Sequence, residues 1–129
     1  MTVELNHTIV PVHDKRKSAA FLAEILGLEP PSPVGPFQCV LTANGVSLDY
    51  DDRWEVTTHH YAFLVSEDTF DAAFERITAD GIPYHAEPNG DRPGEMYHSQ
   101  TGGRGFYFPD PDGHLMELLT VDVTGRAVS

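Results

Sequence analysis

The chain has 129 residues, 40% of them hydrophobic, and this length suits one domain with a sizeable buried core. Its net charge of −12, from 20 acidic and only 8 basic residues, disfavours binding to the phosphate backbone of a nucleic acid. Cys39 is the only cysteine, so an internal disulfide and a cysteine-rich metal site are excluded, and a cytoplasmic location is expected. Because neither a secretory leader nor an apolar run of membrane-spanning length is recognisable, we expect no membrane partner.

The first half of the chain has the pattern of a strand, a helix and a hairpin. A β-like run covers Glu4–Val12. Asp14 is a suitable N-cap for a helix with an apolar stripe, and Gly27 follows that stripe as helix C-termini commonly require. The dipeptide Asn44-Gly45 between two β-like runs predicts a tight hairpin turn.

The second half has the same pattern in the same order. A β-like run covers His59–Val65, and Ser66 precedes a helix with apolar residues at i, i+3, i+4 and i+7. Gly81 is expected to end this helix. The dipeptide Asp112-Gly113 predicts a second hairpin turn.

The two halves therefore look like copies of one βαβββ module. His7 and His60 occupy equivalent positions in the copies. We predict an α+β fold and a single domain over residues 1–129, with one module over 1–53 and the other over 57–124. The tandem modules are expected to form a curved mixed sheet around a cleft.

Three residues of this pattern suggest a metal site in that cleft. His60, rather than His59, is the counterpart of His7, and strand alternation sends His60 and His59 to opposite faces. Glu117 lies in an otherwise apolar strand, where an ionised carboxylate is costly unless a cation or a donor such as Arg104 meets it. Two imidazoles and one carboxylate from three strands form a set that holds a divalent metal and leaves coordination positions open.

The stretches LNHTIVPVHD, THHYAFLVSEDTFD and GRGFYFPDPDGHLMELLT resemble the metal-binding segments of the vicinal oxygen chelate superfamily. This superfamily includes glyoxalase I, extradiol dioxygenases, fosfomycin-resistance enzymes and bleomycin-resistance proteins. The resemblance covers nearly the whole chain and implies that His7, His60 and Glu117 are the metal ligands. It also implies a homodimer. The metal would be Fe, Mn, Ni or Zn, because imidazole and carboxylate ligands suit several first-row ions.

Asp49 is the repeat equivalent of Glu117 and is predicted to line the same site. It would serve either as a fourth metal ligand or as a hydrogen-bond partner of a ligand histidine. Glu117 itself is expected to act in catalysis as well as in metal binding.

Four further residues are candidates for contact with the substrate. Tyr107 is either a core residue or a catalytic phenol that hydrogen-bonds a metal-bound oxygen. Tyr97 and His98 lie in a glycine-rich segment over residues 85–105 that is expected to be a mobile flap. Arg104 is expected either to anchor a substrate anion or to offset local acidity.

Taken together, these residues predict a metal-dependent lyase, isomerase or dioxygenase whose small-molecule substrate chelates the metal through vicinal oxygens. Fosfomycin is a poor candidate substrate, because the segment MYHSQTGGRGFYF contains no lysine to bind a phosphonate. The alternative is a metal-free bleomycin-resistance-type protein that sequesters a cationic drug. The net charge of −12 favours this alternative, whereas retention of all three ligand residues argues against it.

Overall fold

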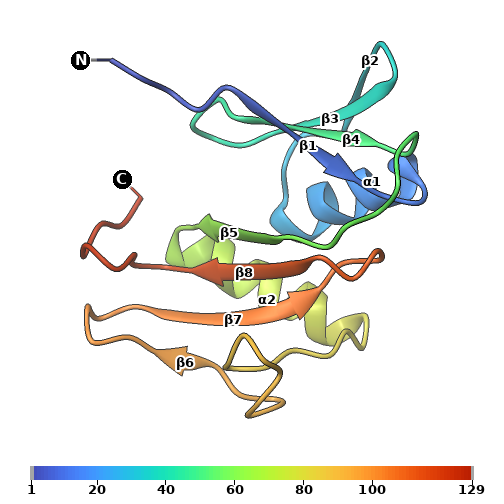
Figure 1. The fold of residues 1–129 in the computed structure, drawn as a ribbon. Coiled ribbons are helices and arrows are strands. Elements are labelled where there is room, and N and C mark those ends of the chain that lie inside the picture. Colours follow the sequence, from blue (N-terminus) through green and yellow to red (C-terminus); the bar gives the residue numbers. More distant parts are fainter. Residues whose placement is uncertain (1, 129) are drawn as a thin grey trace. The chain divides into compact units, whose positions relative to one another are not determined.

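The computed structural model describes residues 2–128 and divides into two compact units, with the boundary between Thr57 and Thr58. Each unit contains one helix and one four-stranded sheet (Figure 1). Within the described residues, no helix is long and apolar enough to cross a membrane.

The first unit holds a mixed sheet with the strand order β1-β4-β3-β2. β1 runs parallel to β4, and the other two pairs are antiparallel. The helix α1 packs against β3 and β4. The elements are β1 (His7–Pro11), α1 (Lys15–Leu26), β2 (Ser32–Val34), β3 (Phe37–Leu41) and β4 (Ser47–Asp51).

Local sequence explains where these elements begin and end. The Asp14 side chain accepts hydrogen bonds from the first backbone N–H groups of α1, as an N-cap does. Gly27 closes the helix in the left-handed conformation, with φ of 67°, which a residue without a Cβ adopts at little cost. Asn44 and Gly45 form the predicted turn between β3 and β4.

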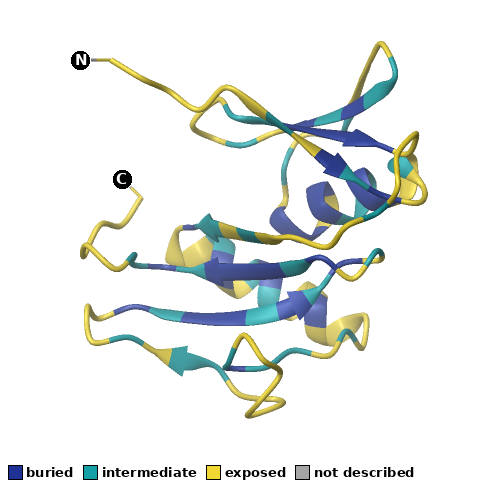
Figure 2. Ribbon diagram, in the orientation of Figure 1, coloured by how far each residue is buried: buried dark blue, intermediate teal, exposed yellow. Residues whose placement is uncertain are grey.

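The second unit repeats this architecture with the strand order β5-β8-β7-β6. β5 runs parallel to β8, and the remaining pairs are antiparallel. Figure 2 shows that β7 and β8, in the middle of this sheet, are its most buried strands. The elements are β5 (His60–Leu64), α2 (Glu67–Ala79), β6 (Tyr97–His98), β7 (Arg104–Pro109) and β8 (Leu115–Leu119).

The core of the second unit is a cluster of rings between α2 and the sheet. Phe106 of β7 is fully buried and meets Phe70, Phe74 and Tyr84 at centroid distances of 5.2, 5.5 and 5.8 Å. All three contacts are edge-on, the arrangement that the aromatic quadrupole favours. The ring cluster fixes one face of the sheet against the helix and leaves the other face for polar residues.

The strand registers confirm the α+β fold of tandem βαβββ modules. In the first unit Ile9 pairs with Asp49, and in the second unit Ala62 pairs with Glu117. Asp49 and Glu117 are thus equivalent in the sheets as well as in the sequence.

One expected feature differs from the structure. The segment over residues 85–105 was expected to be a flap, but Tyr97 and His98 form β6 and pair with Gly105 and Arg104 of β7. His85, at the start of the segment, also makes an isolated bridge to Tyr107. These backbone hydrogen bonds tie both ends of the segment to the sheet.

Candidate functional site

The second unit brings His60 and Glu117 together on one face of its sheet. His60 Nε2 lies 3.0 Å from Glu117 Oε1, within hydrogen-bond distance. The His60 side chain is 46% exposed and that of Glu117 is 10% exposed, so the pair has a buried acid and an accessible imidazole. Strand alternation explains the meeting, because Glu117 pairs with Ala62, two residues beyond His60 on the same face of β5.

Two phenols surround this carboxylate. The Tyr97 hydroxyl donates to Glu117 Oε2 at 2.5 Å, and Tyr107 stands directly opposite Glu117 in the β7–β8 pair. Burial, together with the neighbouring Glu117 carboxylate, raises the pKa of Tyr97 above its ordinary value and raises the pKa of Tyr107 to about 12. Both phenols therefore stay protonated near neutral pH and act as hydrogen-bond donors.

A cavity of about 340 Å³ adjoins Glu117. Its lining consists of phenol rings, aliphatic side chains and acidic or hydroxyl groups, and none of the described residues that line it is Lys or Arg. Its lining residues are Ala86, Glu87, Tyr97, Ser99, Thr101, Tyr107, Glu117, Leu119, Val121, Asp122 and Val123.

The neighbouring histidine, His59, lies on the other side of the strand. Its ring packs near those of Tyr61 and His114, at centroid distances of 6.3 and 6.0 Å. The His59 backbone N–H donates to Nδ1 of His114, a fully buried residue, at 3.0 Å. His114 therefore holds the start of β5 in place and does not join the group around Glu117.

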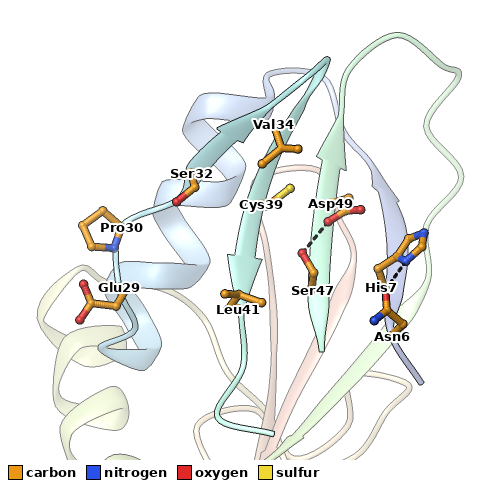
Figure 3. A pocket seen from close by; sticks show the side chains of 10 residues that line it. All are labelled: Asn6, His7, Glu29, Pro30, Ser32, Val34, Cys39, Leu41, Ser47 and Asp49. Carbon is orange, nitrogen blue, oxygen red and sulfur yellow. Dashed lines mark hydrogen bonds between the residues drawn. The ribbon is translucent and has the colours of Figure 1, made fainter. Parts of the chain in front are cut away.

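In the first unit, His7 is exposed at the start of β1 (Figure 3). Its Nδ1 lies 2.8 Å from the side-chain oxygen of Asn6 and donates a hydrogen bond to it. In the neutral ring, this bond leaves the lone pair on Nε2, as a metal-ligating imidazole requires.

Asp49 is buried on β4 and accepts a hydrogen bond of 2.6 Å from the Ser47 hydroxyl. Cys39 of β3 faces Asp49 across the strand pair. Burial first, and then Asp49, raise the pKa of the Cys39 thiol. These residues and His7 line a cavity of about 360 Å³ in the first unit (Figure 3).

The residues present suit a divalent metal, although within residues 2–128 no three His, Cys, Asp or Glu side chains are assembled as a metal site. His60 Nε2 and Glu117 Oε1 are 3.0 Å apart. Two ligand atoms held at right angles, each about 2.1 Å from an ion, have a similar separation of roughly 3 Å.

Two of the residues predicted to contact the substrate, Arg104 and His98, do not contact the Glu117 carboxylate. Arg104 pairs with Glu67 and Asp71 of α2 at 2.6 and 2.7 Å, and its guanidinium lies 4.2 Å from the centroid of the Phe70 ring. His98 is exposed on β6, next to Tyr97, and alternation directs its side chain to the opposite face from the Tyr97 side chain.

Sequence reasoning did not identify three residues at these sites. His85 stacks on Tyr107 at 5.8 Å, Glu87 lines the cavity beside Glu117, and Cys39 faces Asp49. Applying the repeat to the hairpins would have found Cys39, because it is the counterpart of Tyr107.

Comparison with known proteins supports the same assignment of the fold. The sequence model of the glyoxalase/bleomycin resistance protein/dioxygenase superfamily matches residues 4–118. The chain is 32% identical to the glutathione transferase FosA of Serratia marcescens, over 98% of this chain and 86% of that protein.

Two solved structures are more similar still. The oxidase ChaP-H2 is 60% identical, with a TM-score of 0.90 over 95% of this chain and 96% of its own. The oxidase ChaP-H1 is 50% identical, with a TM-score of 0.91 over 94% of this chain and 98% of its own. The family model matches most of the chain, and the duplicated fold agrees with it. The chain therefore belongs to the glyoxalase/bleomycin resistance protein/dioxygenase superfamily, the vicinal oxygen chelate superfamily.

Proposed function

We propose that this protein is a metal-dependent enzyme that binds a small substrate through two neighbouring oxygen atoms on a divalent ion. The observation that carries the proposal is the pairing of His60 with the buried Glu117 beside a cavity. His7 would be the third ligand, and Asp49 either a fourth ligand or a hydrogen-bond partner of a ligand. The ion would be Fe, Mn, Ni or Zn, acting as a Lewis acid on the chelated oxygens.

Within the superfamily, oxidation is the reaction best supported by similarity. The two solved structures at 50% and 60% identity are named oxidases. We therefore propose that the protein catalyses a dioxygenase or oxidase reaction, and we consider an isomerase or lyase reaction less well supported. Tyr107 would face the substrate, since it lies opposite Glu117 and lines the cavity. A homodimer and a cytoplasmic location are part of the same proposal.

The negative charge of the cavity lining limits the kind of substrate that can bind there. Glu87, Glu117 and Asp122 line it, and no basic residue within the described range 2–128 does. An anionic group such as a phosphonate would therefore meet repulsion without a compensating cation. We propose a neutral or cationic substrate, contacted by the Tyr97 ring. For Arg104 to contact a substrate, its ion pairs with α2 would have to open, so this role remains a prediction.

The decisive experiment is metal analysis of protein purified without chelators, repeated for His60→Ala and, as a matched control, for His59→Ala. We expect stoichiometric metal in the wild type and in His59→Ala, and loss of metal in His60→Ala. Absence of metal from the wild type, together with tight binding of a basic glycopeptide, would instead support a drug-binding protein.

The substrate class can be tested on the cobalt-loaded protein. Catechol, a neutral molecule with two neighbouring oxygens, is expected to change the visible spectrum of bound Co²⁺. Methylphosphonate at the same concentration is expected to have little effect. The reverse order would contradict the proposed charge selectivity.

A further inference from the structure

The two oxygens of the Glu117 carboxylate have different partners. Oε1 lies 3.0 Å from His60 Nε2, and Oε2 accepts the Tyr97 hydroxyl at 2.5 Å. Glu117 is only 8% exposed, so water has little access to compete for these bonds. The carboxylate is therefore held by two side chains, and a metal ion that displaces the His60 contact would leave the Tyr97 contact in place.

Tyr97 reaches Glu117 because the residue beside it has no side chain. Tyr97 pairs with Gly105 in the β6–β7 register. A Cβ placed on Gly105 would lie 2.3 Å from both Cζ and the hydroxyl oxygen of Tyr97, far closer than atoms can approach. The Tyr97 ring thus lies across β7 in a space that only glycine leaves open, with its hydroxyl directed to Glu117.

We propose that Tyr97 is a positioning residue that occupies Oε2 of Glu117 and so reserves Oε1, the oxygen beside His60, for the metal. This inference rests on the metal-binding function proposed above. A carboxylate that bound through both oxygens would use one more coordination position. By holding Oε2, Tyr97 keeps that position available to a substrate that needs two neighbouring ones.

The test is titration of metal-free protein with Co²⁺, followed by visible absorption, in the wild type, Tyr97→Phe and Tyr84→Phe. The last variant is a matched control, because it also removes a phenol hydroxyl from the second unit but at a ring packed against Phe74 and Phe106. Tyr97→Phe is expected to weaken Co²⁺ binding about 10-fold, the lower end of the effect seen when a partner of a metal ligand is lost, and to alter the Co²⁺ spectrum. Tyr84→Phe is expected to match the wild type.

A second measurement does not depend on metal. Urea midpoints of the metal-free wild type, Tyr97→Phe, Glu117→Leu and the double variant form a thermodynamic cycle. If Tyr97 holds Glu117, the shifts of the two single variants will not add in the double variant. Gly105→Ala is expected to weaken Co²⁺ binding at least as much as Tyr97→Phe, because the added Cβ would displace the Tyr97 ring and would also meet the Leu118 backbone oxygen at 2.6 Å.

Three outcomes would overturn the inference, and they differ in what else they affect. Equal Co²⁺ affinity and spectra in the wild type and Tyr97→Phe would refute it and leave the proposed function standing. Additive shifts of the urea midpoints would also refute the inference and leave the proposed function standing, because they would show that the Tyr97–Glu117 bond does not contribute to stability. A wild-type protein that binds no Co²⁺ at all would refute the proposed function, and this inference with it.

Discussion

Cys39 stands directly opposite Asp49 in the β3–β4 pair, at the position that Tyr107 holds opposite Glu117 in the β7–β8 pair. The duplicated sheet therefore places a buried carboxylate at the same point in both units, faced by a thiol in one and a phenol in the other. The surroundings differ in consequence. Asp49 accepts from the Ser47 hydroxyl, whereas Glu117 is held by the Tyr97 phenol and the His60 imidazole. The two carboxylates are equivalent in fold but not in chemistry.

The Cys39 thiol should report on Asp49. Burial and the Asp49 carboxylate raise the pKa of this thiol, and the Ser47 hydroxyl lowers it. Since the thiolate is the reactive form, Asp49→Asn is expected to speed modification of Cys39 by an aromatic disulfide reagent at pH 8. Ser47→Ala is expected to slow it. The measurement is the rate of Cys39 modification as a function of pH in the wild type and both variants. Identical pH profiles for Asp49→Asn and the wild type would contradict the prediction.

His114 is expected to stabilise the start of β5 through its Nδ1 atom, which accepts the His59 N–H. In His114→Asn the amide oxygen can take the place of Nδ1 and accept the His59 N–H, whereas in His114→Gln the oxygen lies one bond further out. We expect His114→Gln to lower the free energy of unfolding by about 0.5–1.5 kcal/mol, the net contribution of one hydrogen bond, because the His59 N–H is only partly buried. His114→Asn is expected to lower it less. Urea denaturation of the two variants makes the comparison, and equal losses would count against this role.

Asp51 should contribute stability that acid removes. It is buried at the end of β4, and hydrogen bonds from Arg53, above all, and from Trp54 lower its pKa to about 2. Because the folded-state value lies below the unfolded value of about 4, the contribution is complete above pH 4 and is lost as the pH falls toward 2. Asp51→Asn is expected to lower the melting temperature at pH 7 and to show a smaller further loss than the wild type between pH 4 and pH 2. Parallel losses in both proteins over that range would show that Asp51 is not the group responsible.

Phe106 is expected to be the residue on which the ring cluster of the second unit depends most. Phe106→Ala removes the ring that contacts Phe70, Phe74 and Tyr84, and should lower the free energy of unfolding by about 3–5 kcal/mol. Val123→Ala is the control, because Val123 is 91% exposed and its loss should change stability by less than about 0.5 kcal/mol. Urea midpoints and slopes of the two variants provide the measurement.

Much of the fold could be predicted from the sequence because its signals are local and occur twice. The caps Asp14 and Ser66, and the turns at Gly45 and Gly113, mark the same element boundaries in both copies. Alternation along one strand was enough to predict that His60 and His59 point to opposite faces. These features depend on neighbouring residues and on a period of two, so no knowledge of distant contacts was needed.

The partners of the side chains were decided only by the tertiary structure. Arg104 had been a candidate for pairing with Glu117 or with a substrate, yet it lies against Glu67 and Asp71 of α2, more than thirty positions earlier in the chain. Tyr97 reaches Glu117 only because Gly105, on a different strand, leaves room for its ring. Such contacts depend on which elements pack together and on the space that each residue leaves. A pattern along the chain can therefore predict which face a residue occupies, but not the group that it meets there.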